Sequence, residues 1–133
     1  MNTADLIQRA CQLAIPVTKD NAEMGSVSCV LITESNTIFE GVCIDTISGM
    51  GFCAEHTAIS QMITQREYRV RKIVAVKNDG GGSFSVLSPC GRCREFLYQI
   101  NNENLSTEVV LGAELVRPLR ELLPYNDWSE KVE

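Results

Sequence analysis

Three cysteines at the starts of two separate helical segments constrain the fold of this chain more than any other feature. Cys53 opens the stretch CAEHTAIS, and Cys90 and Cys93 form a C-x-x-C pair in LSPCGRCREF, where Pro89 suits a helix start. Unsatisfied N–H groups and the positive dipole end of a helix N-terminus favour thiolates. We therefore expect two helix N-termini to meet at one metal ion, and three thiolates favour Zn²⁺.

Glu55 follows Cys53 by two positions and is the expected catalytic residue. Residues two apart in a regular helix lie about 200° around the axis, so both side chains can reach the same site only if it lies over the helix end. Cys53 can then bind the ion while Glu55 stands beside it without being a ligand. An open zinc site lowers the pKa of bound water to about 7, and a nearby carboxylate can move the protons.

A closed structural zinc site is the main alternative. Cys53, His56, Cys90 and Cys93 would supply four ligands, because C-x-x-H followed by C-x-x-C is a legitimate finger-like spacing. Structural zinc usually stabilises chains that are too small to own a core. This chain has 133 residues, of which 44% are hydrophobic, and does not need that support. We therefore favour the open site and keep a non-catalytic zinc domain as the alternative.

The order of the predicted elements indicates one α/β domain over residues 1–133, with helices covering a central sheet. Helical spacing of apolar residues is found over Ala4–Ile15, from Cys53 onward, from Pro89 onward and in VRPLRELLP. β-rich runs are found over Val27–Thr33, Thr37–Ile44, Lys72–Lys77 and Thr107–Gly112. The stretch NDGGGS is predicted to be a flexible loop.

Charge and composition exclude several classes of partner. Twelve basic and seventeen acidic residues give a formal charge of −5, which repels a phosphate backbone, so we expect no nucleic-acid partner. The chain has no apolar run of about twenty residues and no signal-like N-terminus. We expect a cytoplasmic protein that does not contact a membrane and that acts on a small molecule. In that compartment its six cysteines should be free thiols or metal ligands and not disulfides.

The motifs CAEHTA and SPCGRCRE resemble the paired C-A-E and P-C-x-x-C motifs of the zinc-dependent cytidine deaminase family. LSPCGRCRE and RELLP are also similar to the blasticidin S deaminase branch. The resemblance covers nearly the whole chain and implies a three-layer α/β/α fold with a central mixed sheet. It also implies that Cys53, Cys90 and Cys93 bind Zn²⁺. Glu55 would relay protons while a cytosine nucleoside is hydrolysed to its uracil form with release of ammonia.

Two stretches depart from the family pattern. The family usually has an arginine after C-A-E that donates to the thiolates, and this chain has His56, so we expect His56 or Arg94 to stand beside the sulfurs. In FEGVCIDTIS, Cys43 and Asp45 replace an Asn and a Glu that hold the ribose hydroxyls in the family. Sugar binding must then be weaker or differently arranged. Cytidine, deoxycytidine and blasticidin S remain alternative substrates.

The predicted substrate contacts extend to the C-terminal tail. They are Cys43, Asp45, Ala54, Ser88, Pro89 and Trp128. The resemblance implies a homo-oligomer, a tetramer, with pockets near subunit boundaries. Tyr125 and Trp128 lie on a polar tail after Pro124, and aromatic residues are enriched in interfaces. We expect one of them to pack near a pocket that a second chain completes; the alternative is that Trp128 folds back onto its own chain.

Overall fold

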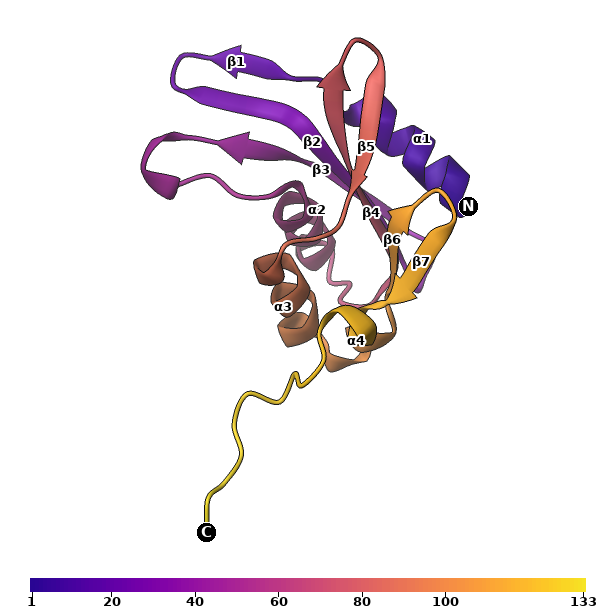
Figure 1. Cartoon of the computed structure of the whole chain (residues 1–133), viewed down its shortest axis with the longest axis vertical. Coiled ribbons are helices and arrows are strands. Elements are labelled where there is room, and N and C mark those ends of the chain that lie inside the picture. Colours follow the sequence, from indigo (N-terminus) through magenta and orange to yellow (C-terminus); the bar gives the residue numbers. More distant parts are fainter.

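A seven-stranded sheet organises the structure, a computed structural model that describes all residues 1–133 (Figure 1). The pairing of β4 with β6 is parallel and every other pairing is antiparallel, so the sheet is mixed, as predicted. The strands are β1 (Val17–Lys19), β2 (Ala22–Thr33), β3 (Ile38–Asp45), β4 (Val70–Gly80), β5 (Ser83–Leu87), β6 (Glu108–Gly112) and β7 (Leu115–Pro118).

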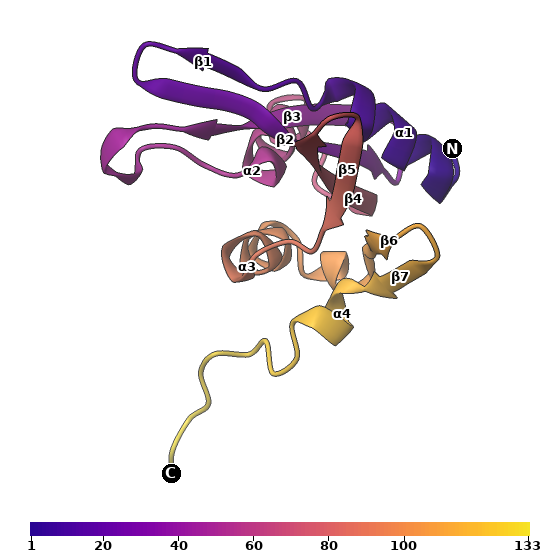
Figure 2. The ribbon, with the colours of Figure 1, turned by 45° about the horizontal axis from the view of Figure 1, so that its top comes forward.

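The helices cover both faces of this sheet and confirm the three-layer prediction. Helix α1 lies on one side of the central strands and α3 on the other (Figure 2). No helix is both long and apolar enough to span a bilayer. The helices are α1 (Thr3–Leu13), α2 (Ala54–Thr64), α3 (Gly91–Ile100) and α4 (Leu119–Leu122), with 3-10 turns η1 (Ile47–Gly49) and η2 (Asn102–Ser106).

The core is divided by the sheet into two apolar clusters. Val30 of β2 faces α1, where it packs in a cluster with Leu6 and Ala10. Its neighbour Leu31 faces the opposite layer and packs in a cluster with Ile59 of α2 and other apolar residues. Successive side chains of a strand point to opposite faces, so a strand covered on both faces is buried almost continuously. This explains why the run VSCVLIT contains so few polar residues.

Helix α2 sits close to β3 because a glycine leaves room for it. A Cβ atom built on Gly41 would lie 2.5 Å from the backbone nitrogen of Ala58. The loop before α2 is held to the same strand by two backbone hydrogen bonds between Ile44 and Phe52, of 2.8 and 3.1 Å. Together these contacts fix the position of the first turn of α2, which carries Cys53 and Glu55.

Two predicted elements differ from the structure. The stretch NDGGGS is not a flexible loop: β4 continues to Gly80 and the chain returns as β5, because Gly80, Gly81 and Gly82 take φ angles of 86°, 62° and 79° that other residues rarely adopt. The stretch VRPLRELLP is mainly not helical. Its first residues pair with β6 as β7, and only Leu119–Leu122 form a helical turn. Strand β1 was not predicted.

Candidate active site

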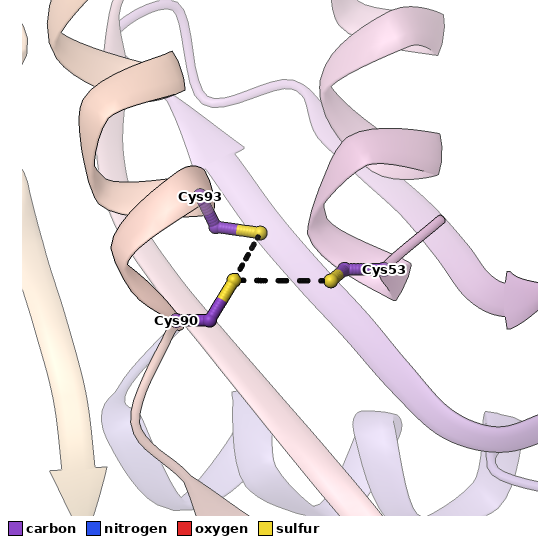
Figure 3. Close-up of side chains that lie close together, drawn as sticks. All are labelled: Cys53, Cys90 and Cys93. Atoms are coloured by element: carbon purple, nitrogen blue, oxygen red, sulfur yellow. Dashed lines mark hydrogen bonds between the residues drawn. The ribbon is translucent and has the colours of Figure 1, made fainter. Parts of the chain in front are cut away.

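Three thiols converge between the N-termini of α2 and α3 (Figure 3). Cys53 is the N-cap residue of α2, Cys90 is the N-cap residue of α3, and Cys93 lies in the first turn of α3. The Sγ atom of Cys90 is 3.9 Å from that of Cys53 and 3.6 Å from that of Cys93. All three sulfurs lie within 4.8 Å of one another. The structure thus brings together the three predicted ligands.

The spacing of the sulfurs fits a zinc ion. Two thiolates at about 2.3 Å from a tetrahedral zinc lie about 3.8 Å apart, close to the separations of 3.9 and 3.6 Å from Cys90 Sγ to the other two sulfurs. Burial acts to raise the pKa of Cys90, but N–H groups of Cys93 and Arg92 and the neighbouring thiols outweigh it, so that pKa is lowered. Burial and the nearby Glu55 charge raise the pKa of Cys93. A divalent cation would keep both sulfurs ionised, so the residues present fit Zn²⁺.

Glu55 lies beside this cluster without belonging to it. Cys53 has extended backbone angles (φ −69°, ψ 157°), whereas Glu55 is in the first turn of α2. The two side chains therefore leave the backbone in different directions. The Glu55 side chain is buried, with an exposed fraction of 6%. Burial raises the pKa of this carboxyl group, because removal from water disfavours its charged form. A carboxyl group in this position can both take up and release a proton.

Glu55 and two of the thiols open into one cavity of about 390 Å³. A slightly larger hollow, of about 460 Å³, lies over the outer face of α2 but is lined by no ionisable side chain, so the chemistry belongs to the smaller one. The lining of the smaller cavity consists of Ser26, Val27, Cys43, Asp45, Gly51, Phe52, Cys53, Ala54, Glu55, Leu87, Ser88, Cys90 and Arg92.

Most of the predicted substrate contacts lie in this cavity. Cys43, Asp45, Ala54 and Ser88 are part of its wall. The other two are elsewhere in the single chain. Pro89 is buried beside Glu55, in a second cavity of only about 10 Å³. Trp128 is 78% exposed on a tail that runs away from the domain (Figure 1), so it does not fold back onto its own chain.

His56 is not part of the sulfur cluster. Its ring packs between Phe52 and Phe96, with ring centroids 4.9 and 4.7 Å away. Burial and the neighbouring positive charge of Arg92 lower the pKa of His56, so the imidazole is neutral near pH 7. Its Nδ1 atom accepts a hydrogen bond from the guanidinium of Arg92 at 3.3 Å. The four-ligand structural site would need this ring at the metal instead.

Arg94, the second residue expected beside the thiolates, is used to hold the fold together. Its guanidinium donates to the carbonyl oxygens of Pro89 (2.8 Å) and Leu122 (3.0 Å) and to the hydroxyl of Ser88 (2.8 Å). These bonds tie the start of α3 to the end of α4. The cation that lines the cavity is Arg92, inside the C-x-x-C pair.

Several cavity residues were not predicted from the sequence. Arg92 lies between the predicted ligands Cys90 and Cys93, so its position in the sequence could have predicted that it lines the cavity. Ser26 and Val27 come from β2, and nothing in their own stretch of sequence indicates that they face Cys43. The unpredicted lining residues are Ser26, Val27, Gly51, Phe52, Leu87 and Arg92.

The comparison with known protein families agrees with this geometry. Residues 2–109 match the model described as "Cytidine and deoxycytidylate deaminase zinc-binding region". The chain belongs to this family of enzymes. A curated cytidine deaminase from Mycoplasma genitalium is 32% identical over 78 residues, which is 58% of this chain. That match spans only 57% of the length of the relative.

Solved structures of the family share the fold. The cytidine deaminase from Mycobacterium leprae superposes with a TM-score of 0.74 at 24% identity, covering 93% of this chain and 98% of the other. A mutant cytidine deaminase from Mycobacterium tuberculosis gives a TM-score of 0.73 at 25% identity, covering 94% of this chain and 97% of the other. The predicted fold class is therefore confirmed.

Proposed function

We propose that this protein is a zinc-dependent hydrolytic deaminase that converts a cytosine nucleoside, or a nucleoside analogue containing cytosine, to the uracil form with release of ammonia. The observation that carries the proposal is the placement of the buried Glu55 carboxyl group in one cavity with Cys53 and Cys90, next to Cys93. Zinc ligands and a proton-transferring group are the two components that this hydrolysis needs.

The residues divide the work between them. Cys53, Cys90 and Cys93 would hold the ion, which when bound supplies a water with its pKa lowered to about 7 as the nucleophile. Glu55 would accept a proton at its carboxylate from the attacking water and pass it to ring N3 of the cytosine. It would then carry the proton of the hydroxyl formed at C4 to the amino group, which leaves as ammonia. Its raised pKa suits both directions of transfer. The walls of the 390 Å³ cavity would exclude bulk water and hold the nucleoside.

The identity of the sugar is the finer part of the proposal. Cys43 and Asp45 lie in the cavity wall, where the resemblance placed the ribose contacts. Neither is the residue typical of enzymes that act on cytidine, so a deaminase specific for blasticidin S remains the alternative. Ammonia release from cytidine, deoxycytidine, cytosine and blasticidin S tests the proposal. Release from cytidine, deoxycytidine or blasticidin S supports it. Release from free cytosine alone, or from none of the four compounds, by the zinc-loaded protein contradicts it.

The same proposal includes a homotetramer in which one chain completes the pocket of another. Tyr125, Trp128 and Val132 of the tail are 98%, 78% and 97% exposed in the single chain. Ile47 and Met50, on the loop between β3 and α2, are also largely exposed. Aromatic side chains such as those of Tyr125 and Trp128 are enriched in protein–protein interfaces. We expect the tail of one chain to cover an apolar surface of a neighbour.

A further inference from the structure

A short segment between two regular elements carries one of the three thiols. Residues 88–90 connect the end of β5 to the start of α3, and Ser88 and Cys90 line the catalytic cavity. No backbone–backbone hydrogen bond involves Ser88 or Pro89. The ladders and turns of the fold therefore leave the position of this segment to other contacts.

One side chain supplies those contacts. The guanidinium group of Arg94 donates from Nε to the carbonyl oxygen of Pro89 and from Nη2 to the hydroxyl of Ser88, both at 2.8 Å. Neither residue makes any other hydrogen bond. The donors of a guanidinium group have a fixed planar arrangement, so the two acceptors are held in a defined position relative to Arg94.

The same guanidinium group is anchored on α4. Its Nη1 atom donates to the carbonyl oxygen of Leu122, the last residue of that helical turn, at 3.0 Å. Carbonyl groups at a helix end have no partner within the helix. Leu119, at the start of α4, is fully buried in the apolar cluster that contains Leu97 of α3. Arg94 forms no ion pair with a carboxylate. Its contacts therefore link a fixed point of the core to the segment before Cys90.

We propose that Arg94 is a positioning residue for the zinc site, which holds residues 88–90 against α4 and so keeps the Cys90 sulfur in place before the ion binds. The inference rests on the proposed function, in which Cys90 is a zinc ligand. Without Arg94, the segment would be ordered only when the ion binds, and that ordering lowers the affinity. Removing a residue that orients metal ligands typically weakens metal binding about tenfold to a hundredfold.

The zinc affinity of Arg94→Ala tests this inference, measured by competition with a chromophoric chelator on the full-length protein. Arg69→Ala is the matched control. Arg69 also donates to three oxygen atoms, those of Val70, Asn104 and Thr107, and it lies outside the cavity. Both variants should be less stable than wild type. The zinc dissociation constant should rise about tenfold to a hundredfold in Arg94→Ala, and less than about threefold in Arg69→Ala, because Arg69 orients no ligand.

Two further measurements separate positioning from charge and from general destabilisation. Arg94→Lys keeps the positive charge but cannot bind three separate oxygen atoms in the same geometry, so its zinc dissociation constant should also rise at least about tenfold. Co²⁺ in place of zinc reports on the sulfurs through thiolate-to-metal absorption bands. These bands should change in both Arg94 variants and match wild type in Arg69→Ala.

Equal zinc affinities of Arg94→Ala and Arg69→Ala would overturn the inference. Wild-type affinity in Arg94→Lys would also overturn it, because charge alone would then suffice. If Arg94→Ala does not fold, the comparison of Arg94→Lys with Arg69→Ala decides the question. A wild-type protein that binds no zinc would overturn the proposed function as well.

Discussion

The Sγ atoms of Cys53 and Cys90 lie 3.9 Å apart, although the two residues are separated by 37 positions in the sequence. Each is the N-cap residue of its own helix, and the two helices pack on the same face of the sheet. The metal site is therefore a product of the tertiary fold. Because apolar clusters on both faces of the sheet hold the helices in place, we expect the zinc-free protein to remain folded.

The first prediction concerns zinc content. We expect one zinc ion per chain in the purified protein and loss of that ion in Cys90→Ser, because a hydroxyl is a poor ligand for Zn²⁺ in place of a thiolate. Cys11→Ser is the matched control, since Cys11 lies on α1 outside the cluster. Inductively coupled plasma mass spectrometry, after dialysis against a chelator, measures the zinc content of each variant. Equal retention of zinc by both variants would contradict the assignment of Cys90.

His56→Ala tests the open site against the structural one. We expect this variant to keep its zinc, because the His56 ring accepts from Arg92 and is not among the clustered ligand atoms. Its melting temperature should fall, since stacking on Phe52 and Phe96 is lost, with about 0.5–1.5 kcal/mol for each aromatic pair. Loss of zinc to the same degree as in Cys90→Ser would support a four-ligand structural site instead.

Burial of Glu55 should cost stability in the zinc-free protein. Its pKa in the folded state lies above the ordinary value of 4.5. The folded state thus binds the proton more tightly than the unfolded state, so the free energy of unfolding falls as the pH rises from about 4.5 through the raised pKa. Glu55→Gln removes this dependence and should raise the melting temperature at pH 7.

Thermal unfolding in a chelator at pH 5 and pH 7 measures the effect of Glu55. Glu121→Gln, at an exposed position of α4, is the control and should follow the wild-type curve at both values. A Glu55→Gln variant that is less stable than wild type at pH 7 would contradict this prediction. It would mean that the folded protein stabilises the charged form of the Glu55 carboxylate.

The central architecture and the ligand set were readable from the sequence because their signals are local. Helical spacing of apolar residues located α2 and α3, and Cys53, Cys90 and Cys93 lie at the starts of these helices. The family resemblance then implied that the three cysteines bind zinc. Strands β2, β3, β4 and β6 were predicted because the buried runs are rich in β-branched residues. The order of these elements predicted an α/β domain with helices covering a central sheet, and the family resemblance supplied the three-layer arrangement.

The features that were missed depend on partners far away in the sequence. Strand β7 has the apolar spacing of a helix, and its pairing with β6 decides its conformation. The backbone N–H of Val27 in β2 donates a hydrogen bond to Cys43 Sγ in β3, at 3.3 Å, next to a shift in the register of the two strands between Met24 and Ser28. A single stretch of sequence does not define that register. The sequence alone does not distinguish the roles of Arg92 and Arg94. In the structure, Arg94 donates hydrogen bonds to the carbonyl oxygens of Pro89 and Leu122, whereas Arg92 lines the cavity.

Truncation after Pro124 tests the role of the tail. We expect the shortened protein to keep its zinc, to assemble less tightly and to have a higher KM, because Tyr125 and Trp128 would no longer reach a neighbouring chain. Sedimentation velocity and steady-state kinetics measure these effects, and Trp128→Ala should reproduce part of them. A full-length protein that sediments as a monomer at micromolar concentration, with full activity, would contradict the shared pocket.

The most direct test of the account is ammonia release by wild type and by Glu55→Gln, on whichever cytosine nucleoside the wild type accepts. The amide preserves the shape of the side chain but cannot relay protons, and general acid–base catalysis contributes about 10²–10⁴-fold. We predict a fall in kcat of at least about a hundredfold with zinc content unchanged. A Glu55→Gln variant that releases ammonia at a rate near that of wild type would contradict the central claim.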